Sequence, residues 1–340
     1  MKIGLPLLIA LLAATTALPC QESTYHVVAR VALAGEGGWD YLTVDTTAHR
    51  LYVSRGTHVA VVDLDRDSVV GDIPNTVGVH GIVILRDLNR GYTSNGQDST
   101  VTVFDLRTLA PAATIKVTGR NPDAIAYEPV SRRLFTFNGG SANTTAIDPV
   151  AGKVVGTLAL GGKPEFAVAD GRGRIYVNIE DRSELVVFDA RTLMTEKRWS
   201  LAPCEEPSGL AIDRARRRLF SVCGNRMMAI SDAEGGRVLA TLPIGAGTDG
   251  AAFDPQTRLA FSSNGEGTLT VVREETPDSF RVVGTVPTQR GGRTVALDER
   301  THRVYTVAAD FGPAPEPTPD RPRPRPPVIP GSVVLLVLER

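Results

Sequence analysis

A repeated four-strand unit runs along this chain, and a tandem repeat constrains a fold more strongly than any single segment does. Each copy joins a strand that ends in an acid, a polar turn, an arginine and a second strand that carries an aromatic residue. The clear copies are VDTTAHRLYVS (44–54), YEPVSRRLFTF (127–137), IDRARRRLFSV (212–222) and LDERTHRVYTV (297–307). Looser copies span 85–94, 169–178 and 253–262. The period of about 40 to 45 residues is typical of a β-propeller, in which each unit forms one radial blade.

Third and fourth strands complete the unit. The third strands read VAVVDLD (59–65), VTVFDLR (101–107), LVVFDAR (185–191) and MMAISDA (227–233). The fourth strands read KVVGTLALG (153–161), RVLATLPIG (237–245) and RVVGTVPTQ (281–289). We count about seven units and predict an all-β fold, a seven-bladed β-propeller of four-stranded blades.

The last unit lacks a fourth strand of its own. Its strands are expected at 293–298, 303–308 and 332–339, while the segment YHVVARVALAG (25–35) precedes the first unit and has the features of a fourth strand. We predict that this N-terminal strand completes the last blade and closes the ring, which removes exposed sheet edges. A Pro-rich loop at 309–331 lies within the same blade. It is either a stiff spacer or a lid or docking strap.

The composition fits such a fold and limits the partners. The 33 glycines and 23 prolines favour many short strands and turns over long helices. The formal net charge of −1 leaves no basic excess to neutralise phosphates, so no nucleic-acid partner is expected. We expect a small molecule or an exported protein as the partner, no transmembrane segment in the mature chain, and a monomer.

The N-terminus, MKIGLPLLIALLAATTALPC, is typical of an export signal. Lys2 is followed by a short apolar run and by small residues that suit cleavage near Ala17. We assign 1–19 as a signal peptide and 20–340 as a single propeller domain, located in the periplasm or outside the cell. Anchoring of a lipoprotein at Cys20 is the alternative, although Leu18 and Pro19 fit a lipobox poorly.

Two further cysteines, Cys204 and Cys223, are expected at the same face of the fifth blade, one in the loop entering it and one ending its second strand. In an oxidising compartment they predict a disulfide. A redox or metal-binding role is the alternative, but the chain has no C-x-x-C spacing to support it.

The pattern D-x-x-x-x-R-[LV]-[YF]-[VTS], followed by V-x-V-[FV]-D and V-V-G-T-[LIV], resembles the YVTN-repeat, YncE-like family of seven-bladed propellers. The resemblance covers nearly all of the mature chain. It implies an exported propeller and does not imply a particular chemistry.

One polar position recurs five residues before the end of each first strand. Its seven copies, called the mouth ring below, are Asp40, His80, Asp123, Glu165, Ser208, Asp249 and Arg293. The first strand of each blade lines the central channel, so these side chains are expected to meet at one mouth of it. Their chemical variety favours a ligand site, and a hydrated channel mouth remains the alternative.

A second polar set occupies the turns between second and third strands, which face the same way. It consists of Arg55, Asn95, Asn138, Asn178, Asn225 and Asn264. These residues either add to the ligand site or serve turn geometry alone, since Asn favours tight turns. Glu206 precedes Ser208 and adds acidity to this face. The acids at the opposite face are expected to be structural: Asp45, Glu128, Asp213, Asp254 and Asp298.

Four carboxylates, one histidine and several carboxamides could bind calcium or another hard cation, with Glu165 and Asp249 as candidate ligands. Zinc is less suited, because His80 is the only histidine of the mouth ring. A catalytic triad of Ser208 with His80 and Asp123 is excluded, because Ser208 and His80 come from blades too far apart around the ring.

Two functions follow. The first is an exported propeller that binds a small ligand, cation or protein partner at the channel mouth without catalysis. The second is a divalent-metal-dependent hydrolase of lactone or ester type, because lactonase propellers hold a cation with a similar set that Glu165, Asn178, Asn225 and Asp249 could mimic. Those enzymes usually have fewer blades and an entry motif that is absent here. A quinone- or haem-linked dehydrogenase lacks support, since there is no C-x-x-C-H motif.

Overall fold

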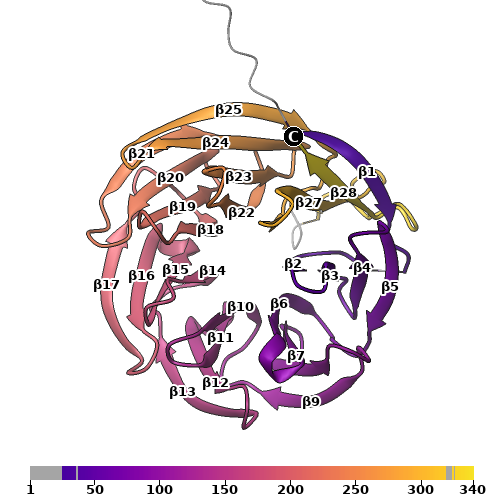
Figure 1. The fold of residues 1–340 in the computed structure, drawn as a ribbon, viewed down its shortest axis with the longest axis horizontal. Helices are drawn as coiled ribbons and strands as arrows, with labels where there is room; N and C mark the ends of the chain where they lie inside the picture. The colour runs from indigo at the N-terminus through magenta and orange to yellow at the C-terminus, as the bar shows by residue number, and fades with distance from the viewer. Residues whose placement is uncertain (1–24, 36, 319–323, 325) are drawn as a thin grey trace, which may run out of the picture.

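The structure is a computed structural model that describes residues 25–35, 37–318, 324 and 326–340. The expected signal peptide and Cys20 lie outside the described residues. The chain forms seven four-stranded antiparallel sheets, arranged as blades around a central axis (Figure 1). The predicted all-β, seven-bladed propeller is confirmed.

Each of the first six blades takes its four strands in sequence order, from the axis outward. Blades 1 to 3 contain β2 (Leu42–Asp45), β3 (Arg50–Ser54), β4 (Val59–Asp63) and β5 (Ser68–Ile73); β6 (Val79–Leu85), β7 (Arg90–Asn95), β8 (Thr100–Asp105) and β9 (Pro111–Lys116); β10 (Pro122–Glu128), β11 (Arg133–Asn138), β12 (Asn143–Asp148) and β13 (Lys153–Ala159). Blades 4 to 6 contain β14 (Pro164–Ala169), β15 (Arg174–Ile179), β16 (Glu184–Asp189) and β17 (Met194–Ser200); β18 (Pro207–Asp213), β19 (Arg218–Cys223), β20 (Met227–Asp232) and β21 (Val238–Pro243); β22 (Thr248–Asp254), β23 (Leu259–Asn264), β24 (Thr268–Thr276) and β25 (Ser279–Pro287).

Blade 7 joins the two ends of the described chain. Its strands are β26 (Ala296–Asp298), β27 (Arg303–Ala308), β28 (Val334–Glu339) and β1 (His26–Ala32). β1 is antiparallel to β28, in a register that pairs His26 with Glu339 and Ala32 with Val334. The predicted closure by the N-terminal strand is therefore confirmed.

The hydrophobic core is divided into seven clusters, and each cluster lies between two neighbouring blades. The cluster between blades 7 and 1 contains Leu33, Leu51 and Leu335, each 1% exposed or less. The cluster between blades 3 and 4 includes the edge-to-face pair Phe135 and Phe188, with ring centroids 5.6 Å apart. A blade buries its faces only against its neighbours, so each interface depends on a closed ring.

Acids at the face opposite the mouth serve local structure, as predicted. Asp45, Glu128, Asp213, Asp254 and Asp298 each accept hydrogen bonds from backbone N–H groups of the turn that follows. Asp298 also contacts His49 of blade 1, with 3.2 Å between its Oδ2 and the histidine Nε2. These acids therefore stabilise turns and join neighbouring blades.

Helix is confined to two single 3-10 turns, η1 (Arg86–Leu88) and η2 (Glu180–Arg182), among the described residues. Neither turn is long enough to show a helical periodicity in the sequence. In the part of the chain that the structure covers, no helix has the length and apolar character needed to cross a bilayer.

The predicted disulfide joins Cys204 and Cys223, whose Cα atoms are 5.6 Å apart and whose residues are 19 positions apart in sequence. Such a bond is typical of a protein outside the cytoplasm. It ties the loop entering blade 5 to the end of β19, and both cysteines are buried.

Replacing both cysteines by alanine is expected to lower the free energy of unfolding by about 3 kcal/mol, because a closed loop of this size limits the unfolded chain. Urea unfolding of the oxidised protein and the variant measures the difference. Adding a reductant should bring the wild type to the variant's midpoint and leave the variant unchanged. Equal midpoints without a reductant would show that the bond adds no stability.

Candidate functional site

Irregularities in the pairing of the first two strands position the residues of the mouth ring. In blades 2 to 6 the register between the first and second strands shifts around the ring residue, for example between Val79 and Ile82 around His80. The same shift surrounds Asp123, Glu165, Ser208 and Asp249. A bulge of this kind bends the strand and re-aims a side chain. Asp40 and Arg293 precede β2 and β26, which begin later in blades 1 and 7.

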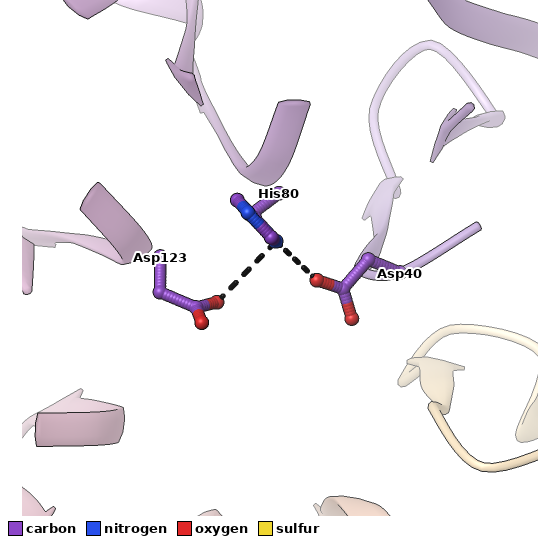
Figure 2. Close-up of side chains that lie close together, drawn as sticks. All are labelled: Asp40, His80 and Asp123. Carbon is purple, nitrogen blue, oxygen red and sulfur yellow. Dashed lines mark hydrogen bonds and ion pairs between the residues drawn. The ribbon is translucent and has the colours of Figure 1, made fainter. Parts of the chain in front are cut away.

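Five of the seven ring residues form a continuous arc across blades 6, 7, 1, 2 and 3. The Arg293 guanidinium lies 3.0 Å from a carboxylate oxygen of Asp249 and 3.7 Å from one of Asp40. His80 Nδ1 lies 2.5 Å from Asp40 Oδ2 and 3.7 Å from Asp123 Oδ1. Figure 2 shows the imidazole of His80 between these two carboxylates. The phase of the repeat therefore brings together residues about 40 positions apart.

Glu165 belongs to a separate cluster beside the arc. Its carboxylate lies 2.7 Å from the Lys163 ammonium, which also pairs with Glu180. Lys163 and Glu180 are not in the mouth ring and the sequence did not single them out. Lys163 could have been suspected, because it stands two residues before the ring acid on the same approach to β14.

Two aromatic side chains meet in the channel. Tyr41 of blade 1 and Phe166 of blade 4 directly follow ring residues, and their rings stack with centroids 4.3 Å apart and planes 19° apart. The other residues at this position are small: Gly81, Ala124, Gly209, Gly250 and Thr294. A Cβ on Gly209 or Gly250 would meet backbone atoms of the next blade at 2.7 Å. The close approach of the blades thus requires small residues, and the two aromatics fill the space between them.

The ring is more acidic than basic, and burial makes its carboxyl groups hard to ionise. Burial and the charge of Asp123 outweigh the Lys163 ammonium and raise the pKa of Glu165 to about 8. Burial and the charge of Asp40 raise the pKa of Asp249 to about 7. Burial raises the pKa of Asp123 to about 6, against the opposing effect of His80. A cation at the ring would favour the ionised carboxylates.

His80 and Tyr41 respond to the same charges. Burial works to lower the pKa of His80, but its hydrogen bond to Asp40 and the charges of Asp123 and Asp40 outweigh burial and raise it. Burial, followed by the charges of Asp123 and Asp40, raises the pKa of Tyr41 far above its usual value. The Tyr41 hydroxyl is therefore a neutral group among carboxylates, and within the described structure it has no hydrogen-bond partner.

These raised pKa values predict how stability depends on pH. A carboxyl whose pKa is higher in the folded than in the unfolded state favours folding below its unfolded pKa, and this contribution is lost as pH rises through the folded value. For Glu165 the pH window runs from the usual glutamate pKa of 4.5 up to about 8. Glu165→Gln should match the wild type near pH 5 and exceed its unfolding free energy by about 2 kcal/mol at pH 8.5.

Urea unfolding with a chelator at the two pH values tests this expectation. Glu316→Gln is the control, because Glu316 is exposed in the Pro-rich loop and is not a member of the mouth ring. The expectation fails if Glu165→Gln and Glu316→Gln change the pH profile equally.

The remaining ring residue and Glu206 do not join the arc. The Ser208 hydroxyl donates to the Thr248 carbonyl at 3.4 Å, which agrees with the exclusion of a triad with His80. Glu206 is exposed, and its backbone carbonyl accepts from the Gly224 N–H within the disulfide-linked loop.

The asparagines of the second polar set are bonded within the fold, which favours a role in turn geometry over a part in the ligand site. The amides of Asn95, Asn138 and Asn264 are buried and bond to hydroxyl or amide groups of their own blades. Asn178 donates to the carbonyls of Ser208 and Gly209, and Asn225 donates to that of Pro203. Because these amides are already bonded within the fold, they serve turns and blade contacts. Asn178 and Asn225, which the lactonase-like set would need, thus bond to backbone carbonyls in this structure.

Arg55, the last member of that set, is fully buried. Its guanidinium donates to the carbonyls of Leu33 and Gly35 at 3.0 Å and to that of Gly37 at 3.4 Å. Burial lowers its pKa. Arg55 thus fixes the segment between β1 and β2, which carries Trp39 and Asp40 to the mouth.

One group of potential metal ligands stands out among the described residues. Asp40, His80 and Asp123 each offer an atom, and these atoms lie within 4.8 Å of one another. The earlier candidates Glu165 and Asp249 are not in this group. The three residues come from consecutive blades and from the same position of the repeat.

Two solved structures share this fold. Hydrazine synthase from Kuenenia stuttgartiensis gives a TM-score of 0.67 at 18% identity, over 81% of this chain and 94% of that chain. The WD40 repeats of RRP9 give a TM-score of 0.75 at 10% identity, over 91% and 97% of the two chains. At such identities the likeness concerns the fold alone. No protein-family model and no curated protein matches the sequence.

Proposed function

We propose that this propeller binds a divalent metal cation at its channel mouth, through Asp40, His80 and Asp123. The observation that carries the proposal is the convergence of one imidazole and two carboxylates, from three blades, within 4.8 Å. The fold itself is consistent with ligand or protein binding. A bound cation would in turn favour ionisation of the nearby carboxyl groups of Asp249 and Glu165, whose pKa values burial raises.

The ligand set favours some ions over others. Carboxylates suit Mg²⁺, Ca²⁺ and Mn²⁺, whereas a neutral imidazole suits Zn²⁺ and other transition ions. With His80 among the ligands, Mn²⁺ or Zn²⁺ fits better than the calcium expected from the acids alone. His80 offers Nδ1, the atom that faces both Asp40 and Asp123.

A proton and a metal ion would compete for this place. Without a cation, a proton joins His80 Nδ1 to Asp40 Oδ2 in a hydrogen bond, and this bond together with the charges of Asp123 and Asp40 raises the pKa of His80. A bound cation would replace that proton, so binding should release protons to the solvent. The cluster thus has partners in both states, and we expect the protein to fold without the metal.

Calorimetry of the chelator-treated protein tests the proposal. Mn²⁺ and Zn²⁺ are titrated separately into the wild type, and metal content is measured after dialysis. We expect one ion per chain, and a loss of affinity of about 100-fold in Asp123→Asn, which removes a ligand but keeps the side-chain shape.

Asp249→Asn is the matched control, because Asp249 is a ring carboxylate outside the ligand group. This variant should lower the affinity for the cation only slightly, because it leaves the three proposed ligands in place. The proposal is rejected if the wild type takes up neither ion, or if Asp123→Asn and Asp249→Asn bind equally well.

We also propose that the chain is exported and belongs with the YVTN-repeat propellers that it resembles. The N-terminal pattern and the repeat support this, together with the Cys204–Cys223 disulfide. Mass spectrometry of the mature N-terminus tests export and separates cleavage near Ala17 from lipidation at Cys20. An intact N-terminus in protein from the cytoplasm would overturn it.

A further inference from the structure

A second hollow opens on the mouth face, beside the ring and between blades 6, 7 and 1. Its volume is about 350 Å³, and we call it the side cavity. Its main lining residues are Trp39, Arg290, Gly291, Arg293, Phe311 and Val328. Ligand sites usually occupy about 300 to 1,000 Å³, so the side cavity has room for a molecule of one or two rings.

The walls of the side cavity are aromatic and apolar. The rings of Trp39 and Phe311 have centroids 6.2 Å apart and planes tilted by 49°. Phe311 is held in place by a β-bridge to Val328, the two residues coming from the beginning and the end of the Pro-rich loop. The Gly312 N–H also donates to the Pro327 carbonyl at 2.9 Å. The described ends of this loop thus form a fixed wall of the side cavity.

Glycines keep the side cavity open. A Cβ on Gly291 would lie 2.9 Å from Phe311 and 3.2 Å from Trp39, so a side chain there would push the two rings. Gly38 also lines the side cavity, and a Cβ at that position would meet nothing within 4 Å. A larger residue at Gly38 would therefore grow into free space without a backbone clash.

The charge of the side cavity is positive on one side. Arg290 is exposed, and its guanidinium lies 5.8 Å from the centre of the Phe311 ring. No carboxylate of the described residues forms an ion pair with it, whereas Arg293 is paired with Asp249 and Asp40. A guanidinium that rests on an aromatic ring keeps its N–H groups free to bind a planar anion.

We propose that the side cavity binds a small organic anion with a flat apolar body, such as an aromatic carboxylate. The body lies against Trp39, Phe311 and Val328, and the carboxylate pairs with Arg290. The guanidinium fork matches a carboxylate in two parallel hydrogen bonds, which a point charge would not do. The apolar walls hold the flat body, and the exposed Arg290 meets the carboxylate at the rim of the side cavity.

The proposed anion contacts and the proposed cation ligands are different residues, although Arg293 lines the side cavity and also lies 3.7 Å from Asp40. The charge of the anion site comes from Arg290 and its walls from Trp39 and the Pro-rich loop, none of which is a proposed cation ligand. The experiment is therefore done with a chelator present. Failure of one proposal leaves the other standing.

Calorimetry with two matched probes tests the charge requirement. The probes are 2-naphthoate, which is an anion, and 2-naphthamide, which is neutral and has nearly the same shape. We expect the wild type to bind 2-naphthoate about tenfold more tightly than 2-naphthamide. Equal affinities, or no binding of 2-naphthoate up to millimolar concentration, would overturn the proposal.

Three variants locate the site. Arg290→Gln should remove the preference for 2-naphthoate and leave the affinity for 2-naphthamide unchanged. Gly38→Leu should lower the affinity for both probes about tenfold or more, because leucine occupies the space that they need. Arg226→Gln is the control, since Arg226 is an exposed arginine in the turn between β19 and β20 of blade 5 and does not line the side cavity.

The proposal is abandoned if Gly38→Leu binds 2-naphthoate as well as the wild type does, or if Arg226→Gln and Arg290→Gln weaken it equally. Unfolding midpoints of all three variants show that each remains folded. Asp123→Asn, which addresses the cation site, should bind both probes as the wild type does.

Discussion

Leu33→Asp is expected to destabilise the whole propeller by about 4 kcal/mol or more, because it puts a carboxylate into the core that closes the ring. Leu33 is 1% exposed and lies in the cluster between blades 7 and 1. Its N–H also donates to the Val333 carbonyl at 2.9 Å. With this interface broken, both neighbouring blades expose apolar surface. Urea unfolding should show a large fall of the midpoint.

Val28→Asp is the matched control for this prediction. Val28 lies on β1, the strand that Leu33 directly follows, but is 37% exposed. The same substitution there should change the free energy of unfolding by about 0.5 kcal/mol or less. If the two variants are equally stable, β1 does not close the ring in solution.

Arg55→Met is expected to give the second large effect, a loss of about 3 kcal/mol in the free energy of unfolding. Methionine keeps much of the side-chain volume but leaves the carbonyls of Leu33, Gly35 and Gly37 without their donor. Buried acceptors that lose a charged donor carry the cost of their own desolvation. Urea unfolding measures the loss. Arg55→Lys should recover only part of it, because an ammonium cannot reach carbonyls spread over several residues.

Arg55→Met should also affect the proposed cation site at the channel mouth. The segment that Arg55 fixes continues to Asp40, so the variant should weaken Mn²⁺ binding about tenfold if the cation proposal holds. Arg66→Met is the control for both measurements, because the Arg66 side chain is 77% exposed in a turn of the opposite face. A variant that unfolds easily but binds Mn²⁺ normally would separate the two roles of Arg55.

The position of the mouth ring could be predicted because a repeat fixes phase. Asp40, His80 and Asp123 occupy the same place in successive units, and equivalent places in a propeller lie at the same end of the channel. The closure by β1 followed from a missing fourth strand in the last unit. The pairing of Cys204 with Cys223 followed from their places in one blade.

Contacts within a blade could not be predicted in the same way. Asn95 and Asn138 look available in the sequence, but each is bonded to hydroxyl groups across its own hairpin. Such bonds depend on strand register and side-chain rotamer, which a repeat does not specify. The link from Lys163 to Glu180 was missed for the same reason, since it joins positions outside the repeated one.

The stack of Tyr41 on Phe166 also depends on distance across the ring. The two residues come from blades 1 and 4, and no local pattern in the sequence relates them. In the sequence these two aromatics stand out only as exceptions, because the residues at the equivalent position of the other units are small. Comparing the residue after each ring position would have found it.

The start of the described chain lies at the face away from the mouth. Tyr25 precedes β1, and its hydroxyl donates to the His302 carbonyl in a turn of that opposite face. If the chain is tethered to a lipid surface through Cys20, the tether attaches on this side. The acidic entrance would then point toward the surrounding medium, where ions and solutes diffuse freely, and away from the membrane that holds the protein.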